Sequence, residues 1–135
     1  MKKLFVFLLL LLSFTTFAQI NPAKAITNDI DTLINAGTTK GVVIVYNPAT
    51  TLTFQVKVTK ISGTIGGSIA LQGSLDGVTY YAISGASNLT LTDTATQGTI
   101  WTLTGTPYSY YRLLGTGTGT MRALVVGKYL HRKQW

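Results

Sequence analysis

The stretch Thr51-Leu52-Thr53-Phe54-Gln55-Val56-Lys57-Val58-Thr59 decides the fold class, because apolar and polar side chains alternate along it without interruption. A period of two residues is that of a β-strand, whose successive side chains point to opposite faces. The stretch therefore predicts a strand with one buried and one solvated face. Its buried face carries four apolar side chains: Leu52, Phe54, Val56 and Val58.

Similar stretches follow on both sides of this strand. Turn-forming sequences separate them, among them Asn47-Pro48-Ala49, Asp76-Gly77 and the GTGTG of residues 115–119. Residues 31–35 are expected to add an edge strand, with a short helix over residues 27–35 as the alternative. The remaining strands are expected at residues 41–46, 69–72, 78–84, 89–92, 99–104, 108–114 and 121–130.

About eight short strands, with turns at intervals of roughly 8–12 residues, are typical of an antiparallel sandwich or a small barrel. We therefore predict an all-β chain that forms a single antiparallel β-sandwich of jelly-roll type. The last strand, residues 121–130, is apolar on both faces. We expect it to be central in its sheet or covered by a neighbouring subunit.

The N-terminus is typical of an export signal. Lys2 and Lys3 precede an apolar run over residues 4–12, and the small residue Ala18 follows. The run is shorter than the roughly 20 apolar residues that span a bilayer. We predict a signal peptide or N-terminal membrane anchor at residues 1–18, which would be the only membrane contact. A linker or edge segment at 19–40, the β-sandwich at 41–130 and a basic tail at 131–135 follow.

Composition limits the possible partners. The 135 residues carry a formal net charge of +7 and include no cysteine, so disulfides and thiolate metal sites are excluded. A positive charge favours a glycan or another anionic surface as partner, or it only keeps a small domain soluble. We expect no specific recognition of nucleic acid.

The sequence offers little material for catalysis. There is one histidine, His131, expected to be solvated in the tail, and there is no glutamate. One of the four aspartates belongs to a turn, one ends a strand and two lie in the N-terminal stretch, so no acid–base pair is expected. We predict no enzyme activity, no catalytic residue, no metal and no cofactor. The aspartates are Asp76, Asp93, Asp29 and Asp31.

Aromatic residues are the best binding candidates. An exposed tyrosine ring can stack on the apolar face of a sugar while its hydroxyl makes a hydrogen bond. In the adjacent pairs Tyr80-Tyr81 and Tyr110-Tyr111, strand alternation sends one ring inward and the other outward. The outward ring contacts a ligand, a neighbouring subunit or only water. The candidate ligand-binding residues are Tyr80, Tyr81, Tyr108, Tyr110 and Arg112.

Two motifs carry a resemblance to known domains. The decapeptide LQGSLDGVTY at residues 71–80, followed later by YYRLL at residues 110–114, resembles the second half of discoidin-type (galactose-binding-like) domains. This resemblance implies a jelly-roll fold. The run from Val56 to the C-terminus also resembles small β proteins of phages and mobile elements of Bacteroidota. The leader ending Phe17-Ala18-Gln19 resembles export signals of the same phylum.

Proteins of the second kind are usually virion structural or decoration components. The resemblance therefore implies a non-catalytic structural or assembly protein, exposed on a phage virion or a bacterial cell surface. Its partners would be copies of itself or other surface or virion proteins. The alternative is a secreted glycan- or surface-binding module that uses its outward tyrosines and its basic tail. Either protein would be exported to the periplasm, cell surface or medium, or be associated with a virion.

Overall fold

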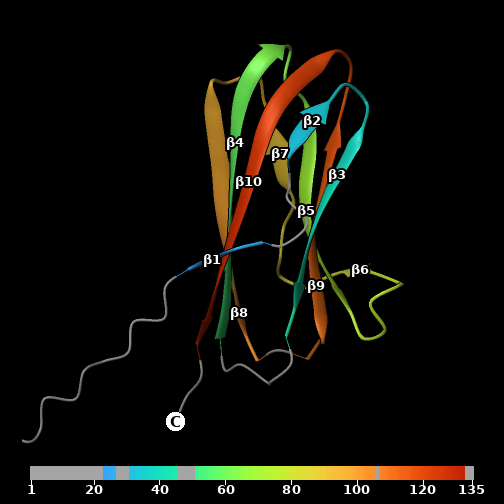
Figure 1. Ribbon diagram of the computed structural model, residues 1–135, viewed down its shortest axis with the longest axis vertical. Helices are drawn as coiled ribbons and strands as arrows, with labels where there is room; N and C mark the ends of the chain where they lie inside the picture. Colours follow the sequence, from blue (N-terminus) through green and yellow to red (C-terminus); the bar gives the residue numbers. More distant parts are fainter. Residues whose placement is uncertain (1–22, 27–30, 46–50, 106, 133–135) are drawn as a thin grey trace, which may run out of the picture.

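A computed structural model describes residues 23–26, 31–45, 51–105 and 107–132 (Figure 1). Within these ranges the chain forms ten β-strands and no helix, so none of the described segments is a helix that could cross a membrane. The strands make two five-stranded sheets with antiparallel pairing throughout, and the sheets face each other. The predicted all-β antiparallel sandwich is confirmed.

The first sheet is built around the last strand. β10 pairs along its whole length with β4, β4 pairs with β8, and the short strands β1 and β2 pair with the other side of β10. The apolar final strand is therefore central, as expected. The strands of this sheet are β1 (Lys24–Ala25), β2 (Thr32–Ile34), β4 (Thr51–Gly63), β8 (Thr96–Thr104) and β10 (Met121–Arg132).

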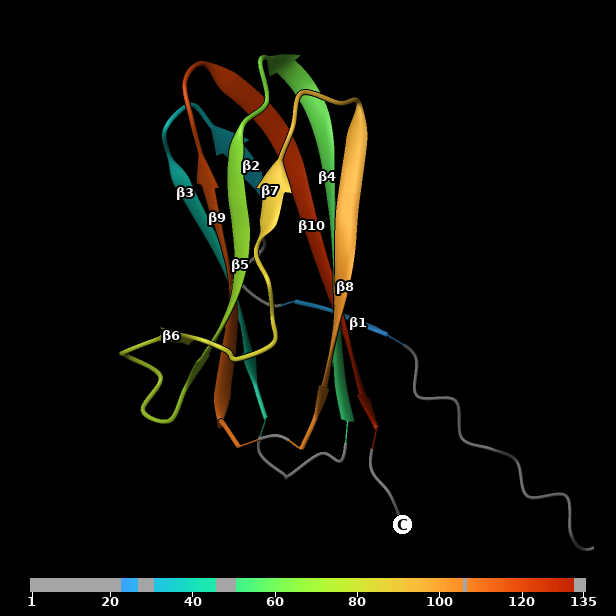
Figure 2. The ribbon, with the colours of Figure 1, turned by 180° about the vertical axis from the view of Figure 1, so that it is seen from behind.

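The second sheet has the order β3-β9-β5-β6, with β7 also paired to β5. Figure 2 shows β7 beside β5, and shows the loop before β6 projecting away from the first sheet. The strands of this sheet are β3 (Thr38–Ile44), β5 (Gly67–Ser74), β6 (Tyr81–Ala82), β7 (Leu89–Leu91) and β9 (Tyr110–Gly117).

The core lies between the sheets and follows the alternation of the sequence. All four apolar side chains predicted for the inner face of β4 are buried, and those of β9 and β5 meet them from the opposite sheet. The rings of Phe54 and Tyr111 join the two sheets, with centroids 5.4 Å apart. Tyr111 is fully buried and Tyr110 is half-buried, so the predicted division of this pair is confirmed. Each buried side chain of this size contributes about 1.5–3 kcal/mol.

The structure differs from the expected strands in several bounds; β9 in particular runs from Tyr110 to Gly117, so residues 115–117 belong to a strand and not to the predicted turn. The edge strand expected at residues 31–35 is confirmed as β2 (Thr32–Ile34), whereas β1 (Lys24–Ala25) is a strand that the sequence did not predict, and it brings the number of described strands to ten. The strand expected at residues 78–84 shortens to Tyr81–Ala82, because residues 75–80 form a loop with its own hydrogen bonds. The predicted leader, the turn at residues 47–49 and tail residues 133–135 lie outside the described residues.

His131 is not the solvated tail residue that was expected. β10 continues to Arg132 and pairs His131 with Leu52, whose side chain is on the buried face of β4. Nε2 of His131 is buried and has no hydrogen-bond partner among the described residues. The position of the ring follows from the strand alternation, which continues two residues beyond the predicted end of the strand.

Candidate functional site

The second sheet divides the five candidate binding residues between its two sides. Tyr110 and Arg112 lie on its outer face, because they alternate along β9 with the buried Tyr111 and Leu113. Tyr80 lies over Arg112 on that same face. Tyr108 lies on the inner side, and Tyr81 is exposed on the edge strand β6. The candidates therefore form two separate groups rather than one site.

The first group is the Arg112 cluster, which we define as Arg112, Gln72 and Tyr80. Nε of Arg112 donates a hydrogen bond of 2.7 Å to Oε1 of Gln72, its register partner on β5. The guanidinium carbon lies 4.2 Å from the centre of the Tyr80 ring, within the range of a cation–π contact. These two contacts hold the guanidinium group in one orientation on an exposed sheet face.

Asp76 fixes the loop that brings Tyr80 to this face. One oxygen, Oδ1, accepts hydrogen bonds from the amides of Val78 and Thr79 at 2.8 and 2.9 Å and from the hydroxyl of Ser74 at 2.8 Å. These donors, the amides of Val78 and Thr79 first, lower the pKa of Asp76 from 3.8 to about 2. The carboxylate therefore orders the turn at any pH near neutrality.

Gly77 lets the same loop fold back on Tyr110. Its φ of +74° lies in the left-handed region, which glycine adopts without steric cost. A Cβ at this position would lie 3.1 Å from Cε1 and Cζ of Tyr110, so the glycine backbone lies against the ring. One part of Tyr110 is thus covered by the loop, and the ring flanks the Arg112 cluster.

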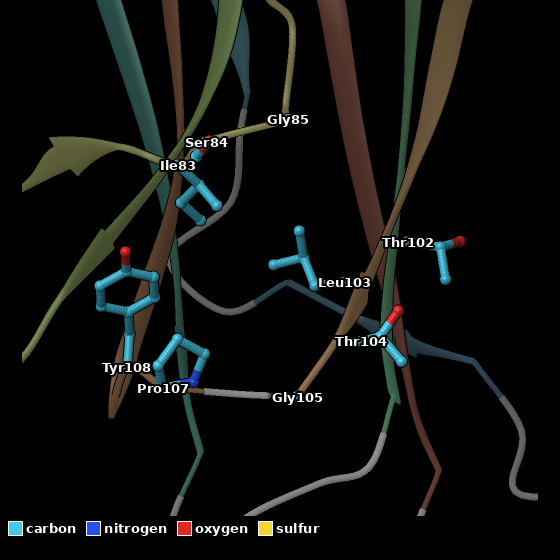
Figure 3. Close-up of a pocket in the computed structure, with 9 residues that line it drawn as sticks. All are labelled: Ile83, Ser84, Gly85, Thr102, Leu103, Thr104, Gly105, Pro107 and Tyr108. Carbon is cyan, nitrogen blue, oxygen red and sulfur yellow. The ribbon is translucent and has the colours of Figure 1, made fainter.

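The second group surrounds a cavity of about 320 Å³ at one end of the sandwich, which we call the end cavity. It lies between the end of β8 in the first sheet and the segments that flank β6 and β9 in the second sheet. In Figure 3 the side chain of Leu103 points into this space toward Ile83 and Tyr108, whereas Thr102 and Thr104 point to the other side of β8. The lining residues are Ile83, Ser84, Gly85, Thr102, Leu103, Thr104, Gly105, Pro107 and Tyr108.

Gly73 places the Tyr108 ring at this cavity. A Cβ on Gly73 would lie 2.6, 2.7 and 3.0 Å from Cδ2, Cγ and Cε2 of the ring. Three neighbouring ring carbons at such similar distances mean that Gly73 lies against the face of the ring and not against its edge. The opposite face of the ring is consequently turned away from the second sheet, toward the cavity. The absence of a side chain on Gly73 makes this arrangement possible.

The buried ring of Tyr111 packs against the ring of Tyr108. The two rings meet edge to face, with centroids 5.8 Å apart and an interplanar angle of 81°. Burial raises the pKa of the Tyr111 phenol, and its buried hydroxyl has no hydrogen-bond partner within the described ranges. Tyr111 is therefore a packing residue at neutral pH, and Tyr108 presents the accessible ring.

The end cavity carries no charged side chain among its lining residues. Four of them are apolar or aromatic, Ser84 adds a hydroxyl, and backbone groups of two glycines border the space. Polar and apolar surface contribute about equally to this lining. Such a lining suits an uncharged ligand with one apolar face.

Tyr81 lies near the rim of this cavity. The register pairs Tyr81 with Gly73, and directly paired residues extend their side chains to the same side of a sheet. The Tyr81 side chain therefore leaves the sheet on the side that Tyr108 covers, and it is 70 % exposed. The sequence analysis did not identify Gln72 or the residues that line the end cavity with Tyr108. A glycine inside a strand, such as Gly73, is a known signal that another group approaches the backbone closely.

The described aspartates do not gather into a catalytic or metal site. Asp93 pairs with Lys60 at 2.7 Å and accepts a hydrogen bond from the amide of Ile65, and both contacts lower its pKa. Asp76 holds its own loop, and Asp31 accepts a hydrogen bond from the hydroxyl of Thr32. Within the described ranges, no group of three or more histidine, aspartate or glutamate residues could hold a metal ion.

No protein-family model matches the sequence, and no curated protein is significantly similar to it. Among solved structures, the chain is similar to a family 16 carbohydrate-binding module-2, with 13 % identity over 83 % of this chain and 87 % of that one and a TM-score of 0.47. It is also similar to the CBM22-1 xylan-binding domain from Paenibacillus barcinonensis, with 11 % identity, coverage of 78 % and 88 %, and a TM-score of 0.41.

A third similar structure is chitosan-binding module 1 of a chitosanase/glucanase from Paenibacillus sp. IK-5, with 18 % identity, coverage of 82 % and 93 %, and a TM-score of 0.37. All three are carbohydrate-binding modules. At these identities and scores, the similarities assign neither a family nor a ligand to this chain.

Proposed function

We propose that this protein is a non-catalytic glycan-binding module whose end cavity takes a neutral sugar. The observation that carries the proposal is the Tyr108 ring, which is held face-on by Gly73 and turns its other face to an uncharged cavity of about 320 Å³. A sugar ring has an apolar face that stacks on an aromatic ring and hydroxyl groups around its edge. Tyr108 supplies the stacking surface, while Ser84 and the bordering backbone supply hydrogen-bond partners.

The fixed position of the ring favours binding. A side chain that is free in solution loses rotamer freedom when it contacts a ligand, which weakens binding. Tyr108 is already held between Gly73 and Tyr111 before any ligand arrives. The exposed ring of Tyr81 gives a second aromatic surface near the rim, where a longer oligosaccharide would leave the cavity.

Calorimetric titration with neutral xylo-, cello- and manno-oligosaccharides tests the proposal. We expect Tyr108→Ala to weaken binding at least about tenfold, because the stacking surface is removed. Tyr108→Phe retains the ring face and is expected to bind within about threefold of the natural protein. Tyr80→Ala, on the opposite side of the sheet, is the matched control and should bind normally. Equal losses for Tyr80→Ala and Tyr108→Ala would refute the cavity as the site.

A structural role in assembly is the second candidate, and the outer face of the first sheet favours it. Leu124 and Val126 of β10 are both 41 % exposed there, and Ile34 of the adjacent β2 is also exposed. Apolar side chains that share an exposed face are a common feature of protein interfaces. Light scattering over a range of concentrations tests this role, and a strict monomer at high concentration would remove self-association. The virion location and the bacterial phylum remain predictions.

A further inference from the structure

Arg112 is a half-buried cation for which the described part of the chain provides no carboxylate. Of the three described aspartates, Asp93 pairs with Lys60, Asp31 lies beside Thr32, and Asp76 is bound by its own loop. Arginine in a partly desolvated position is normally matched with an anion, because its planar guanidinium donates two parallel hydrogen bonds to a carboxylate. Within the described ranges no carboxylate remains for Arg112, which leaves its guanidinium open to an anion of another molecule.

The contacts of Arg112 leave the carboxylate-binding edge of the guanidinium available. Nε donates to Gln72 and the guanidinium carbon lies over the Tyr80 ring, and these are the partners that the described residues supply. The two terminal amino groups make no hydrogen bond within those residues. A guanidinium held by a hydrogen bond at Nε and by contact with the Tyr80 ring can receive a planar acceptor at its terminal amino groups.

A second cation lies diagonally across the sheet from Arg112. β3 pairs Val42 with Arg112 and Lys40 with Leu114, so Lys40 is the diagonal neighbour of Arg112 on the outer face. Diagonal neighbours in antiparallel strands are about 7–8 Å apart. Lys40 is exposed, and no strand of the second sheet carries an acidic residue on either face. Asp76 lies in the loop beside this face, but its carboxylate is bound by amides of that loop, so Arg112 and Lys40 are the charges that attract an anion.

We propose that the Arg112 cluster is a second binding site, separate from the end cavity, that takes the carboxylate of a uronic acid in an acidic polysaccharide. Arg112 holds one carboxylate through its terminal amino groups, and Lys40 attracts the charge of a neighbouring sugar. Gln72 and Tyr80 keep the guanidinium in place, and Tyr110 borders the site as an aromatic surface for the sugar ring. The end cavity, which has no charged lining, takes no part.

Titration of the full chain with oligogalacturonate and with its methyl ester tests this site without altering the protein. The acid is expected to bind, with an affinity that falls as ionic strength rises, and the ester is expected to bind at least about tenfold more weakly. Equal binding of acid and ester would overturn the proposal, and so would no binding of the acid. Neither result affects neutral-sugar binding in the end cavity, so the two proposals fail independently.

Variants of the protein then distinguish binding by the oriented guanidinium of Arg112 from binding by net positive charge. Arg112→Gln is expected to weaken oligogalacturonate binding at least about tenfold, and Arg112→Lys, which keeps the charge without the planar fork, also several-fold. Lys57→Gln removes the same charge from the outer face of the first sheet and is expected to change binding less than about twofold. Thermal unfolding of each variant checks that it folds.

Equal losses for Arg112→Gln and Lys57→Gln would show that net charge alone is responsible, and would overturn the site. Tighter binding of a single-stranded DNA oligonucleotide than of oligogalacturonate, with the same dependence on Arg112, would also overturn it, because phosphate would then be the natural acceptor. A loss with Tyr80→Ala but not with Tyr108→Ala would support the site, since Tyr80 belongs to the Arg112 cluster alone.

Discussion

Replacing Gly73 with alanine disturbs the contact on which the end cavity depends. The new Cβ would lie 2.6 and 2.7 Å from Cδ2 and Cγ of Tyr108. Cγ is at the base of the ring, so the side chain cannot avoid the methyl group by moving its tip alone. Gly73 is not among the residues with positive φ, so its backbone accepts alanine without strain. The effect of the substitution therefore falls on Tyr108.

The expected cost has three parts. An extra methyl group in a packed contact costs about 1–3 kcal/mol, and loss of the edge-to-face contact between Tyr108 and Tyr111 costs about 0.5–1.5 kcal/mol. Alanine in a strand offsets part of this, by about 0.5–1 kcal/mol relative to glycine. We expect Gly73→Ala to lower the free energy of unfolding by about 2 kcal/mol.

Urea unfolding of Gly73→Ala, Tyr108→Ala and the double variant forms the test. Without the Tyr108 ring the methyl group meets no obstacle, so Gly73→Ala in the Tyr108→Ala background is expected to be neutral or stabilising by about 0.5–1 kcal/mol. Neutral-oligosaccharide binding should fall in both single variants. An equal cost of Gly73→Ala in both backgrounds would refute the contact, as would natural stability of the single variant.

Two further predictions concern the loop and the core. Because the pKa of Asp76 is lowered to about 2 from 3.8, its stabilising effect is complete above pH 3.8 and is lost as the pH falls toward 2. The difference in thermal unfolding temperature between the natural protein and Asp76→Ala should therefore shrink as the pH falls across that interval. A difference independent of pH would contradict the role of the carboxylate. Asp31→Ala is the control. Trp101 is buried on β8, and its Nε1 donates a hydrogen bond of 2.8 Å to the carbonyl of Ser87. Trp101→Phe should therefore lower the free energy of unfolding in urea by about 1–3 kcal/mol. An unchanged unfolding midpoint would contradict the role of this hydrogen bond.

The candidate binding residues show where sequence reasoning ends. Alternation along β9 is enough to place Arg112 and Tyr110 on one face and Tyr111 in the core. It gives no information about Gln72, which is 40 positions away from Arg112 and becomes its partner only through the pairing of β5 with β9. Alternation along the predicted strand 108–114 places Tyr108 and Tyr110 on one face, but β9 begins at Tyr110, and Tyr108 lies on the opposite side of the sheet.

The loop at residues 75–80 is likewise predicted only in part by the sequence. Asp76-Gly77 correctly indicates a turn, because aspartate and glycine favour the backbone angles that turns need. The signal predicts a tight hairpin with a full return strand, but the carboxylate of Asp76 binds two amides ahead of it and extends the turn. The extended turn then carries Tyr80 over Arg112.

By itself, the sequence determines that this chain is made of strands, which side chains face the core, and that the chain contains four aspartates, no glutamate and no cysteine. These properties are local, since a period of two residues and the count of residue types need no knowledge of distant partners. Only the tertiary structure decides which strands pair, and hence that Gly73 meets Tyr108 and that Arg112 meets Gln72 and Tyr80. Pairing depends on the combined packing of many distant residues, so the end cavity and the Arg112 cluster exist only once the two sheets have formed.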